Sequence, residues 1–511
     1  MRTALAPSVQ PLPGPRFDWT AGVDDIVVGS GTCGAILAAR LSEQSDRRVL
    51  LIEAGPACAG DGGGPLGRPI LTGANWDFDI RIGGRSFPYW VGRALGGSSA
   101  INGAIAARGL PADFDRWAAA GNAVWAWRLV APLFDQLETA NGGPVPVVHL
   151  DRSELSPIAA AFLGACVALG LSSDVDLYAD DDCGAGLLHT TSAAGRRVST
   201  ADTHLVPAIS RNNLGVLTGS TALRIIFSAS RATAVEVRDG DRTVTVPASR
   251  IVLTAGAINT PALLLRSGIG PATALHDCGI AVVADHPGVG ANLSDHPLIP
   301  LWMIARPGTC DPAESWHQVA VRLATSGDGP DLMVLLVGNV AEAAVPGVGA
   351  ALAGRTGLCL NTMLLSARAR GTVQITGPDP MTAPIITHDL LDDDHDVRRM
   401  AVGVRLAWSV MGTPPFAGRL ERNLMWTSRM VDDDELLERS LRRFVVPGWH
   451  PAGTARMGPA GDPYAVVDQF GQVHGLAGLY VADASIMPAV PSSPPALTCM
   501  VLAERVASWL T

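Results

Sequence analysis

The sequence predicts an α/β fold with more than one domain, and three observations carry this prediction. The chain has 511 residues, which is more than a single hydrophobic core usually accommodates. Near its start a strand, a glycine-rich turn, a helix and a second strand follow one another within about 30 residues, which is the pattern of a βαβ unit. Further along the chain, from 214 to 254, short β-rich runs alternate with turns and add further strands.

The composition and charge of the chain exclude several classes of function. Apolar residue types make up 48% of the residues, which is typical of a globular protein. The formal net charge of −10 argues against nucleic acid or an anionic membrane surface as the main partner. No run of roughly 18 or more apolar residues occurs, so no membrane span is predicted.

The cysteines and the N-terminal segment predict a cytoplasmic protein. The eight cysteines form no C-x-x-C pair, so neither a metal site nor a redox dithiol is expected. Scattered cysteines in a large chain are typical of reduced thiols in a reducing compartment. The first residues, roughly 20, lack the apolar core of a signal peptide, and we expect them to form a tail or a strap packed on the surface.

Apolar runs and turn signals place the expected elements along the chain. The βαβ unit consists of a strand over 24–28, a turn over 29–34, a helix over 35–42 and a strand over 48–52. The Gly- and Pro-rich segment 56–91 is expected to be mostly loop. Further strands are expected at 216–218, 223–226, 233–237, 250–254, 298–305, 331–338 and 357–377. Helices are expected at 125–140, 155–170, 393–412 and 496–510, and the acidic run 432–438 is interpreted as a solvated helix face.

The turn of the βαβ unit, Gly29-Ser30-Gly31-Thr32-Cys33-Gly34, fits the dinucleotide-binding pattern G-x-G-x-x-G. The first glycine permits the tight turn, the second lets the backbone approach a pyrophosphate, and the third lets the helix pack on the strand. Glu53 stands 19 residues beyond Gly34 at the end of the next strand, where it would accept hydrogen bonds from a ribose. The helix N-terminus presents free N–H groups, so the candidate phosphate contacts are Gly29, Gly31, Thr32 and Gly34.

A second glycine-rich stretch, GRALGGSSAING, occupies residues 92–103. Such a turn could run its backbone amides along a phosphate or along a flat ring. The first motif alone permits either NAD or FAD. The stretch 92–103 is therefore needed to decide between NAD and FAD.

Five stretches beyond the first turn carry a recognisable pattern in a fixed order. They are 92–109 with its continuation, 256–271 (GAINTPALLLRSGIGP), 288–297 (GVGANLSDHP), 449–488 with WHPAGTARMG at its start, and 503–507 (AERVA). Together they resemble the glucose–methanol–choline oxidoreductase family, which uses FAD to oxidise alcohols. The region 298–440 matches this family only loosely, around Arg370-Gly371 and Asp379-Pro380, and we expect it to recognise the substrate.

The resemblance implies a Rossmann-like FAD-binding domain and a smaller α+β substrate-binding domain that contains an antiparallel sheet. The FAD-binding domain is discontinuous, because its motifs lie at both ends of the chain and in the middle. The implied ranges are 20–140, 190–297 and 441–511 for the FAD-binding domain, and 141–189 and 298–440 for the substrate-binding domain.

The resemblance also implies roles for individual residues around FAD. Gly29, Gly31 and Gly34 hold the pyrophosphate and Glu53 the ribose; Arg93, Gly96, Gly97, Ser98 and Asn102 wrap the phosphates and the flavin; Ala222 meets the adenine through its backbone; Asp483 and Ala484 contact the ribityl–pyrophosphate part; Trp449 and His450 lie against the isoalloxazine ring. Some family members bind flavin covalently through a His two residues before the Arg of the first signature. Here that residue is Val91, which implies non-covalent FAD.

His450 is the predicted catalytic base. Oxidation of an alcohol needs a group that takes the hydroxyl proton while a hydride leaves for N5 of the flavin. An imidazole near its unperturbed pKa of about 6.5 suits that task. The predicted partners are a small-molecule alcohol and, for reoxidation, oxygen or another electron acceptor.

The usual partner of this base is missing. The family places a second His or an Asn 44 residues after the base, and here that position holds Pro494. In one interpretation Ser492, Ser493 or a residue of the substrate-binding domain supplies the donor, and alcohol oxidation is retained. We favour it, because losing one polar partner costs only about 1–3 kcal/mol. In the other, the chain is a lyase or another non-redox enzyme with structural FAD. The polar and aromatic cluster 314–318 could line the substrate pocket or form a surface loop.

Overall fold

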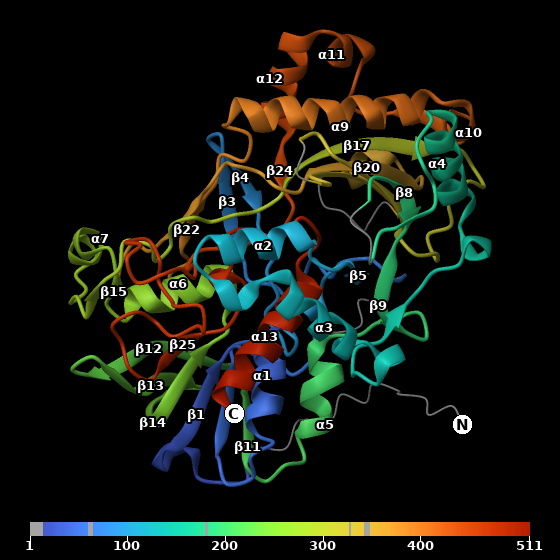
Figure 1. The fold of residues 1–511 in the computed structure, drawn as a ribbon. Helices are drawn as coiled ribbons and strands as arrows, with labels where there is room; N and C mark the ends of the chain where they lie inside the picture. The colour runs from blue at the N-terminus through green and yellow to red at the C-terminus, as the bar shows by residue number, and fades with distance from the viewer. Residues whose placement is uncertain (1–13, 60–64, 179–181, 327–328, 342–347) are drawn as a thin grey trace, which may run out of the picture.

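The computed structural model describes residues 14–59, 65–178, 182–326, 329–341 and 348–511, and Figure 1 shows the path of the chain through them. Most of the expected N-terminal tail or strap, residues 1–13, lies outside the described residues. Just beyond it, Arg16 Nη1 donates hydrogen bonds to the Ser210 carbonyl at 3.2 Å and to Asn212 Oδ1 at 2.9 Å. This part of the segment therefore packs against the body of the protein.

The lower sheet in Figure 1 contains the βαβ unit expected from the sequence. β1 (Val23–Val28) lies parallel to β2 (Val49–Glu53), and α1 (Gly34–Leu41) connects them. In the described part of the chain this sheet has seven strands. The other five are β11 (Leu214–Thr218), β12 (Ser220–Ser228), β13 (Arg231–Asp239), β14 (Arg242–Leu253) and β25 (Leu479–Val481). β11, β2, β1, β14 and β25 run parallel, whereas β12 and β13 extend the sheet antiparallel beside β14.

Burial explains why the central strands of this sheet read as continuous apolar runs. Ile26, Val27, Leu50 and Leu51 are all 0% exposed, since helices and loops cover both faces of a parallel sheet. α13 (Ala496–Leu510) lies beside α1 on one of these faces (Figure 1). The predicted strands of this sheet are all present.

β11, β12 and β13 are longer than predicted, and β14 differs most, since it begins at Arg242 and not at residue 250. Its first half is largely exposed and pairs with β13 in a protruding hairpin, so it lacks the apolar run that marks the buried second half.

The upper sheet has eight strands in the described residues and is mostly antiparallel, as expected for the region that recognises the substrate. Its order is β23-β17-β20-β19-β18-β8-β7, with β24 also paired to β17. The bounds are β7 (Val175–Asp176), β8 (Gly184–Leu187), β17 (Pro297–Ala305), β18 (His317–Leu323), β19 (Leu332–Val340), β20 (Gly357–Leu364), β23 (Leu420–Asn423) and β24 (Val446–Pro447). α9 (Asp394–Gly412) lies across its outer face in Figure 1, with buried Met400 and Val404 in the shared core.

The remaining described helices surround these two sheets. They are α2 (Pro111–Ala119), α3 (Trp127–Leu137), α4 (Pro157–Ala168), α5 (Val206–Ala208), α6 (Gly256–Arg266), α7 (Ala272–Asp277), α8 (Gly349–Leu352), α10 (Pro414–Ala417), α11 (Ser428–Asp432) and α12 (Asp434–Phe444). The acidic run 432–438 is exposed except around Leu437, which confirms a solvated helix face. No helix among the described residues is both long and apolar enough to cross a membrane. The cytoplasmic location stays a prediction.

The segment 56–91, expected to be mostly loop, contains a hairpin of β3 (Asp79–Ile82) and β4 (Arg85–Pro88). Gly83 and Gly84 form its turn with φ of 52° and 74°, and a two-residue turn with two positive φ angles suits the twist of a hairpin. The alternation of these short strands is hidden among the glycines and prolines around them.

The expected strand 357–377 is two strands, β20 and β21 (Thr372–Gln374). The chain leaves the upper sheet between them, where Asp396 Oδ2 accepts backbone N–H groups from Arg368 at 2.6 Å and Ala369 at 3.2 Å. β21 then pairs with β22 (Ile385–Thr387), which joins β3 in a small separate sheet.

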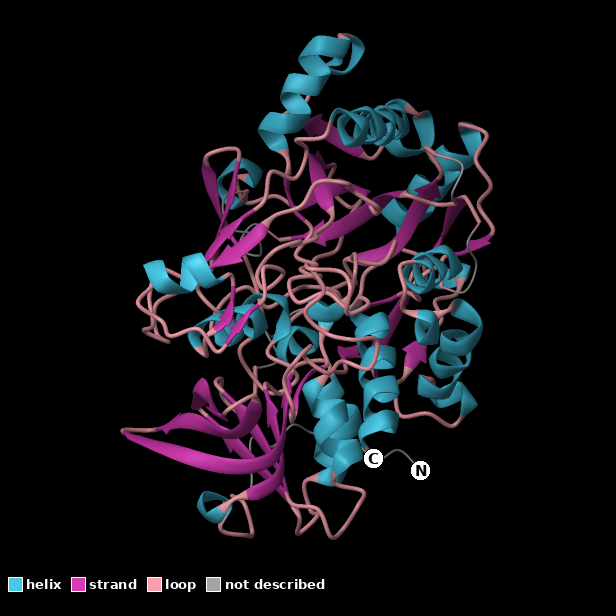
Figure 2. Ribbon diagram, turned by 60° about the vertical axis from the view of Figure 1, so that its left-hand side comes forward, coloured by secondary structure: helices cyan, strands magenta, loops and turns pink. Residues whose placement is uncertain are grey.

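The division of the chain into two domains stays a prediction. The lower sheet takes its strands from the ranges predicted for the FAD-binding domain. The upper sheet takes most of its strands from the ranges predicted for the substrate-binding domain. Its strand β24, however, lies in a range predicted for the FAD-binding domain. The small sheet of β3, β4, β21 and β22 joins the two sets of ranges. Figure 2 shows loops gathered between the two large sheets.

Candidate active site

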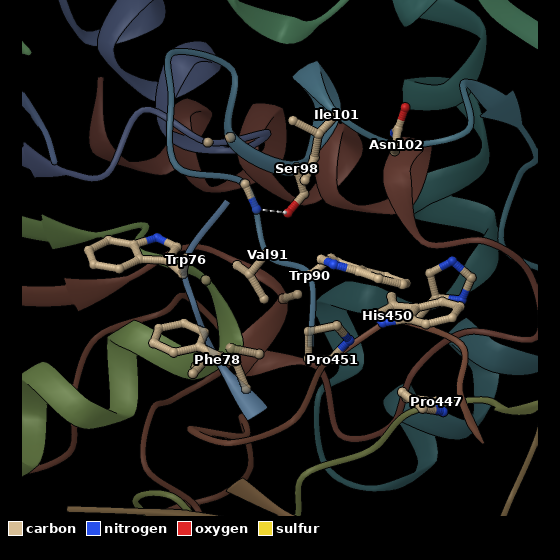
Figure 3. A pocket seen from close by; sticks show the side chains of 18 of the residues that line it. Trp76, Phe78, Trp90, Val91, Ser98, Ile101, Asn102, Pro447, His450 and Pro451 are labelled. Atoms are coloured by element: carbon tan, nitrogen blue, oxygen red, sulfur yellow. Dashed lines mark hydrogen bonds between the residues drawn. The ribbon is translucent and has the colours of Figure 1, made fainter. Parts of the chain in front are cut away.

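A cavity of about 980 Å³ is lined by residues from both large sheets. It extends from the glycine-rich turn after β1 to the Trp449-His450 segment, and Figure 3 shows part of it. The predicted residues that line it are Gly29, Gly31, Thr32, Glu53, Arg93, Gly97, Ser98, Asn102, Ala222, Trp449, His450, Asp483 and Ala484. Gly34 and Gly96 are not among the lining residues. The fold therefore gathers motifs from both ends of the chain around one cavity.

The two glycine-rich turns touch each other at the floor of this cavity. A Cβ at Gly97, whose φ is +50°, would lie 2.6 Å from Gly31 Cα, so a larger residue does not fit. A Cβ at Gly34 would lie 1.8 Å from the Gly29 carbonyl oxygen, which assigns Gly34 to packing of α1 on β1. A Cβ at Gly31 would have no described atom closer than 3.9 Å. A bare backbone in front of a helix N-terminus fits the pyrophosphate of FAD.

The carboxylate of Glu53 is fixed by short hydrogen bonds. Its Oε2 accepts from the backbone N–H and the hydroxyl of Ser30 at 3.0 and 2.7 Å, and its Oε1 accepts from the Gly55 N–H at 2.7 Å. Burial raises the pKa of Glu53. Oε1 keeps a further acceptor site, which is what the hydroxyl of a ribose requires. The guanidinium of Arg93 lies 4.8 Å above the Trp76 ring, on the wall of the same cavity.

Other predicted residues hold the loops that line the cavity. Ser98 Oγ accepts the Gly92 N–H at 3.2 Å, the bond drawn in Figure 3, and Asn102 Oδ1 accepts the Ala104 N–H at 2.9 Å. Asp483 accepts hydrogen bonds from Gly256 and Thr260 in the first turns of α6 and from the N–H and hydroxyl of Ser485, at 2.5 to 2.8 Å. These bonds rigidify the backbone against which a cofactor would lie.

His450 faces the cavity, and a second imidazole, that of His296, supports it from behind. The two Nδ1 atoms are 2.9 Å apart, and the ring planes meet at 80°. Nε2 of His296 lies 3.0 Å from the carbonyl oxygen of Pro491. Because a carbonyl only accepts, Nε2 of His296 carries a hydrogen and its Nδ1 is an acceptor in the neutral ring. His450 must then donate through Nδ1, which leaves its Nε2 without a proton.

Burial keeps both rings neutral near neutral pH, which this assignment of hydrogens requires. It lowers the pKa of His296 to about 4. Burial, and next the neighbouring His296, lower the pKa of His450 well below 6.5. A neutral imidazole with a free Nε2 is the form that can accept a proton.

The carboxylate of Asp295 bonds to both histidines and to Tyr89, the residue that follows β4. Its Oδ1 accepts the backbone N–H groups of His296 at 2.7 Å and His450 at 2.9 Å, and its Oδ2 accepts the hydroxyl of Tyr89 at 2.7 Å. Asp295 is 1% exposed, and burial raises its pKa to about 6. This residue therefore brings a buried negative charge close to the imidazole pair.

Trp449 occupies a backbone conformation that side chains other than glycine rarely adopt. Its φ is +59°, which places it in the left-handed region. The indole Nε1 donates to the Pro88 carbonyl at 3.3 Å, and the ring lies 4.8 Å from that of Trp90. Strain of this kind, held by surrounding contacts, is common in active sites.

The prediction that Ser492 or Ser493 replaces the missing donor is wrong for both serines. Pro494 and Pro495 line the cavity, but neither serine does. Ser492 Oγ donates instead to Asp113 Oδ1 at 2.7 Å. Ser493 Oγ is buried with no hydrogen-bond partner among the described residues. Pro495 immediately precedes α13, a position where its missing N–H is tolerated.

The substrate-binding region does bring polar groups to the cavity. Of the cluster 314–318, Trp316 and His317 line it, whereas Glu314 is exposed on the surface. Asn361 lines it as well. His189 and His388 are not among the residues that line it.

Sequence reasoning missed three residues of the site: Tyr89, Asp295 and His296. Asp295 and His296 are part of the stretch GVGANLSDHP, but nothing in the sequence assigned a role to this adjacent acid and imidazole. No pattern marks Tyr89. All three are identified as site residues only by contacts between distant segments of the chain. His296 and His450, for example, are more than 150 residues apart.

One group among the described residues has the spacing of metal ligands, Asp393, His395 and Asp396 at the start of α9. Its carboxylates are already used. Asp393 caps the helix by accepting the N–H groups of His395 and Asp396, and Asp396 pairs with Arg399 at 3.3 Å. The group therefore does not change the prediction of a metal-free site.

Comparison with known proteins identifies relatives over almost the full chain. Residues 23–298 match the N-terminal and residues 367–503 the C-terminal model of the family described as GMC oxidoreductase. A 5-(hydroxymethyl)furfural oxidase from Methylovorus sp. is 35% identical, covering 95% of this chain and 98% of its own. An alcohol dehydrogenase [acceptor] from Pseudomonas putida is 30% identical, covering 95% of each chain. The crystal structure of pyridoxine 4-oxidase from Mesorbium loti superposes with a TM-score of 0.86 at 30% identity, covering 96% of this chain and 99% of that one. The lyase alternative receives no support from these relatives.

Proposed function

We propose that this chain, which belongs to the glucose–methanol–choline (GMC) oxidoreductase family and is an FAD-dependent alcohol oxidoreductase, uses His450 as its catalytic base. The observation that carries the proposal is the contact between the Nδ1 atoms of His296 and His450. It leaves Nε2 of His450 unprotonated in a residue that lines the cavity. The rest of the site supports the same role.

In the proposed reaction the hydroxyl proton of the alcohol passes to Nε2 of His450, and the alcohol becomes a carbonyl compound. FAD, when bound, supplies the hydride acceptor, N5 of its ring. His450 keeps its Nδ1–H bond to His296 throughout, so the imidazole does not rotate as it gains charge. The carboxylate of Asp295, bonded to the backbone of both histidines, compensates that charge in a buried site.

The cofactor is proposed to lie along the cavity from Gly31 to His450. Gly31 and Gly97 offer bare backbone to the pyrophosphate, and Glu53 offers Oε1 to the ribose. Trp449 and His450 would meet the isoalloxazine ring. Val91 lines the cavity at the position where some family members carry a linking histidine, which supports non-covalent binding. Precipitation of the holoprotein with acid should release the flavin into the supernatant, and retention by the pellet would contradict this part.

The substrate is proposed to be a primary or an activated secondary alcohol. Oxygen or another electron acceptor is proposed to take the electrons from reduced flavin. The relatives include both an oxidase and a dehydrogenase by name, and consumption of oxygen during turnover separates the two possibilities.

The test is anaerobic mixing of the holoprotein with benzyl alcohol while the flavin absorbance is followed. We expect wild type to bleach and His450→Asn to bleach about 100- to 10,000-fold more slowly, because general-base catalysis contributes roughly that factor. His276→Asn, an exposed imidazole on α7, is the matched control and should behave as wild type. Bleaching of His450→Asn at the wild-type rate, with normal flavin content, would overturn the assignment of the base.

A further inference from the structure

The face of the upper sheet that lines the cavity is almost entirely apolar. Every second residue of three adjacent strands points to it, as the side-chain period of a strand requires. These residues are Leu298, Pro300 and Trp302 of β17, Met333, Leu335 and Val337 of β19, and Asn361 and Met363 of β20. Among these described side chains, the hydrogen-bond donors are the amide of Asn361 and the indole N–H of Trp302.

Asn361 lies at the centre of this face. In the sheet register it stands between Pro300 on one neighbouring strand and Leu335 on the other. The adjacent row contains Leu298, which pairs with Val446 just before the segment that carries His450. Asn361 is one row further, which is roughly 6–7 Å along the strands at about 3.3 Å per residue. The distance from the amide to the end of the sheet that leads to His450 is therefore about the length of one substituted aromatic ring.

The orientation of this amide leaves its donors available. Cys359 Sγ, two residues back on the same face, donates to Asn361 Oδ1 at 3.1 Å. The cross-strand neighbours Pro300 and Leu335 have no side-chain acceptor. Nδ2 therefore has no hydrogen-bond partner among the described residues, and Asn361 is only half-buried. Two N–H groups are open toward the cavity, where an acceptor on a ligand can satisfy them.

Flat aromatic surfaces border the same space. Trp302 and Trp316 line the cavity on the side of the sheet. Trp90 and Trp449 line the cavity as well, with their ring centroids 4.8 Å apart and their planes tilted by 31°. Surfaces of this kind favour a planar ring over a flexible or heavily hydroxylated ligand.

We propose that Asn361 determines specificity, and that the substrate is a planar aromatic primary alcohol with a hydrogen-bond acceptor on the ring edge opposite its hydroxymethyl group. Nδ2 of Asn361 donates to that acceptor while the hydroxymethyl group lies at Nε2 of His450. The apolar row between them contacts the ring. This inference rests on the proposed function of His450 but concerns the opposite end of the substrate.

The test compares two alcohols of similar shape, 4-(hydroxymethyl)benzaldehyde, which has the acceptor, and 4-methylbenzyl alcohol, which lacks it. The ratio of their kcat/KM values is measured for wild type and for Asn361→Leu, which keeps the volume but removes the donors. We expect the variant to lower this ratio roughly threefold to tenfold, because one neutral hydrogen bond contributes about that much. Comparing ratios cancels the different intrinsic reactivity of the two alcohols. Met363→Leu, on the adjacent row of the same strand, should change both alcohols by the same factor.

A binding measurement separates failure of this inference from failure of the proposed function. Perturbation of the flavin spectrum gives Kd values for terephthalaldehyde and 4-methylbenzaldehyde without any turnover. Asn361→Leu should weaken the first roughly threefold to tenfold more than the second. Equal effects on both ligands would overturn the role of Asn361, whatever the catalytic result. So would a loss of the preference in Trp302→Phe but not in Asn361→Leu. Wild type that binds with the expected preference but never bleaches would count against the proposed reaction alone.

Discussion

Nδ1 of His296 and Nδ1 of His450 lie 2.9 Å apart, at the end of a chain of bonds that begins at the carbonyl of Pro491. The carbonyl fixes the hydrogen of His296 on Nε2, and His296 in turn fixes the hydrogen of His450 on Nδ1. One backbone oxygen thus determines which nitrogen of His450 is free. The residue that contacts its imidazole comes from the end of the stretch GVGANLSDHP and not from position 494, where a proline stands.

Removal of His296 should slow the reaction without removing the cofactor. In His296→Leu the Nδ1–H of His450 loses its acceptor, so the ring can turn or change tautomer. We expect anaerobic flavin reduction to be roughly 10- to 100-fold slower, as for other residues that orient an imidazole. His296→Asn keeps an acceptor near the position of Nδ1 and should recover part of the rate. Equal rates in wild type and His296→Leu would show that the base needs no such support.

The charge of Asp295 should matter only where this residue is ionised. Asp295→Asn keeps an oxygen for the two backbone N–H groups but removes the negative charge that compensates the imidazolium. Since burial raises the pKa of Asp295 to about 6, wild type has that charge above pH 6 and loses it below. We expect the ratio of wild-type to variant reduction rates to be largest above pH 6 and to fall as the pH drops through about 6. A ratio that does not change with pH would indicate a purely structural role.

The activity of wild type should not depend on a group that titrates at the usual pKa of histidine. His450 must be neutral to accept a proton, and burial lowers its pKa well below 6.5. Protonation, and the loss of the base, therefore occurs at a pH lower than 6.5. We expect kcat/KM to be constant from about pH 6.5 to 8, with its decline at more acidic pH. A midpoint at or above 6.5 in this profile would mean that His450 is not held in the neutral form.

The contact between the two glycine-rich turns should be essential for binding of FAD. In Gly97→Ala the new Cβ would lie 2.6 Å from Gly31 Cα, so one of the turns must move. We expect the purified variant to contain much less flavin per protein, measured by absorbance. Gly83→Ala is the matched control, because Gly83 has a similar φ of +52° but no atom within 4 Å of the new Cβ. It should show a comparable backbone strain, about 1 kcal/mol, with normal flavin content. Loss of flavin in both variants would point to a general loss of stability instead.

Local pattern was sufficient for the parts of the fold that the chain forms with its near neighbours. The βαβ unit around Gly29–Gly34 was predictable because a buried parallel strand, a glycine turn and a helix have different periods and compositions. The β3–β4 hairpin was not, since its four-residue strands lie in a glycine- and proline-rich segment. The first half of β14 was missed because it is exposed and has no buried apolar run.

The sequence by itself determined the class of the protein and the cofactor and singled out His450 as the proposed base, because glycine spacing and short ordered motifs encode a backbone shape that only a few ligands fit. The tertiary structure alone decided what stands behind and opposite the base. His296 and Asp295 contact His450, and Tyr89 contacts Asp295, across large separations in the chain. The register of a sheet places Asn361 among the residues that line the cavity. Hydrogen bonds between distant segments depend on angles and distances of a few tenths of an ångström, which are fixed only when the whole core has packed.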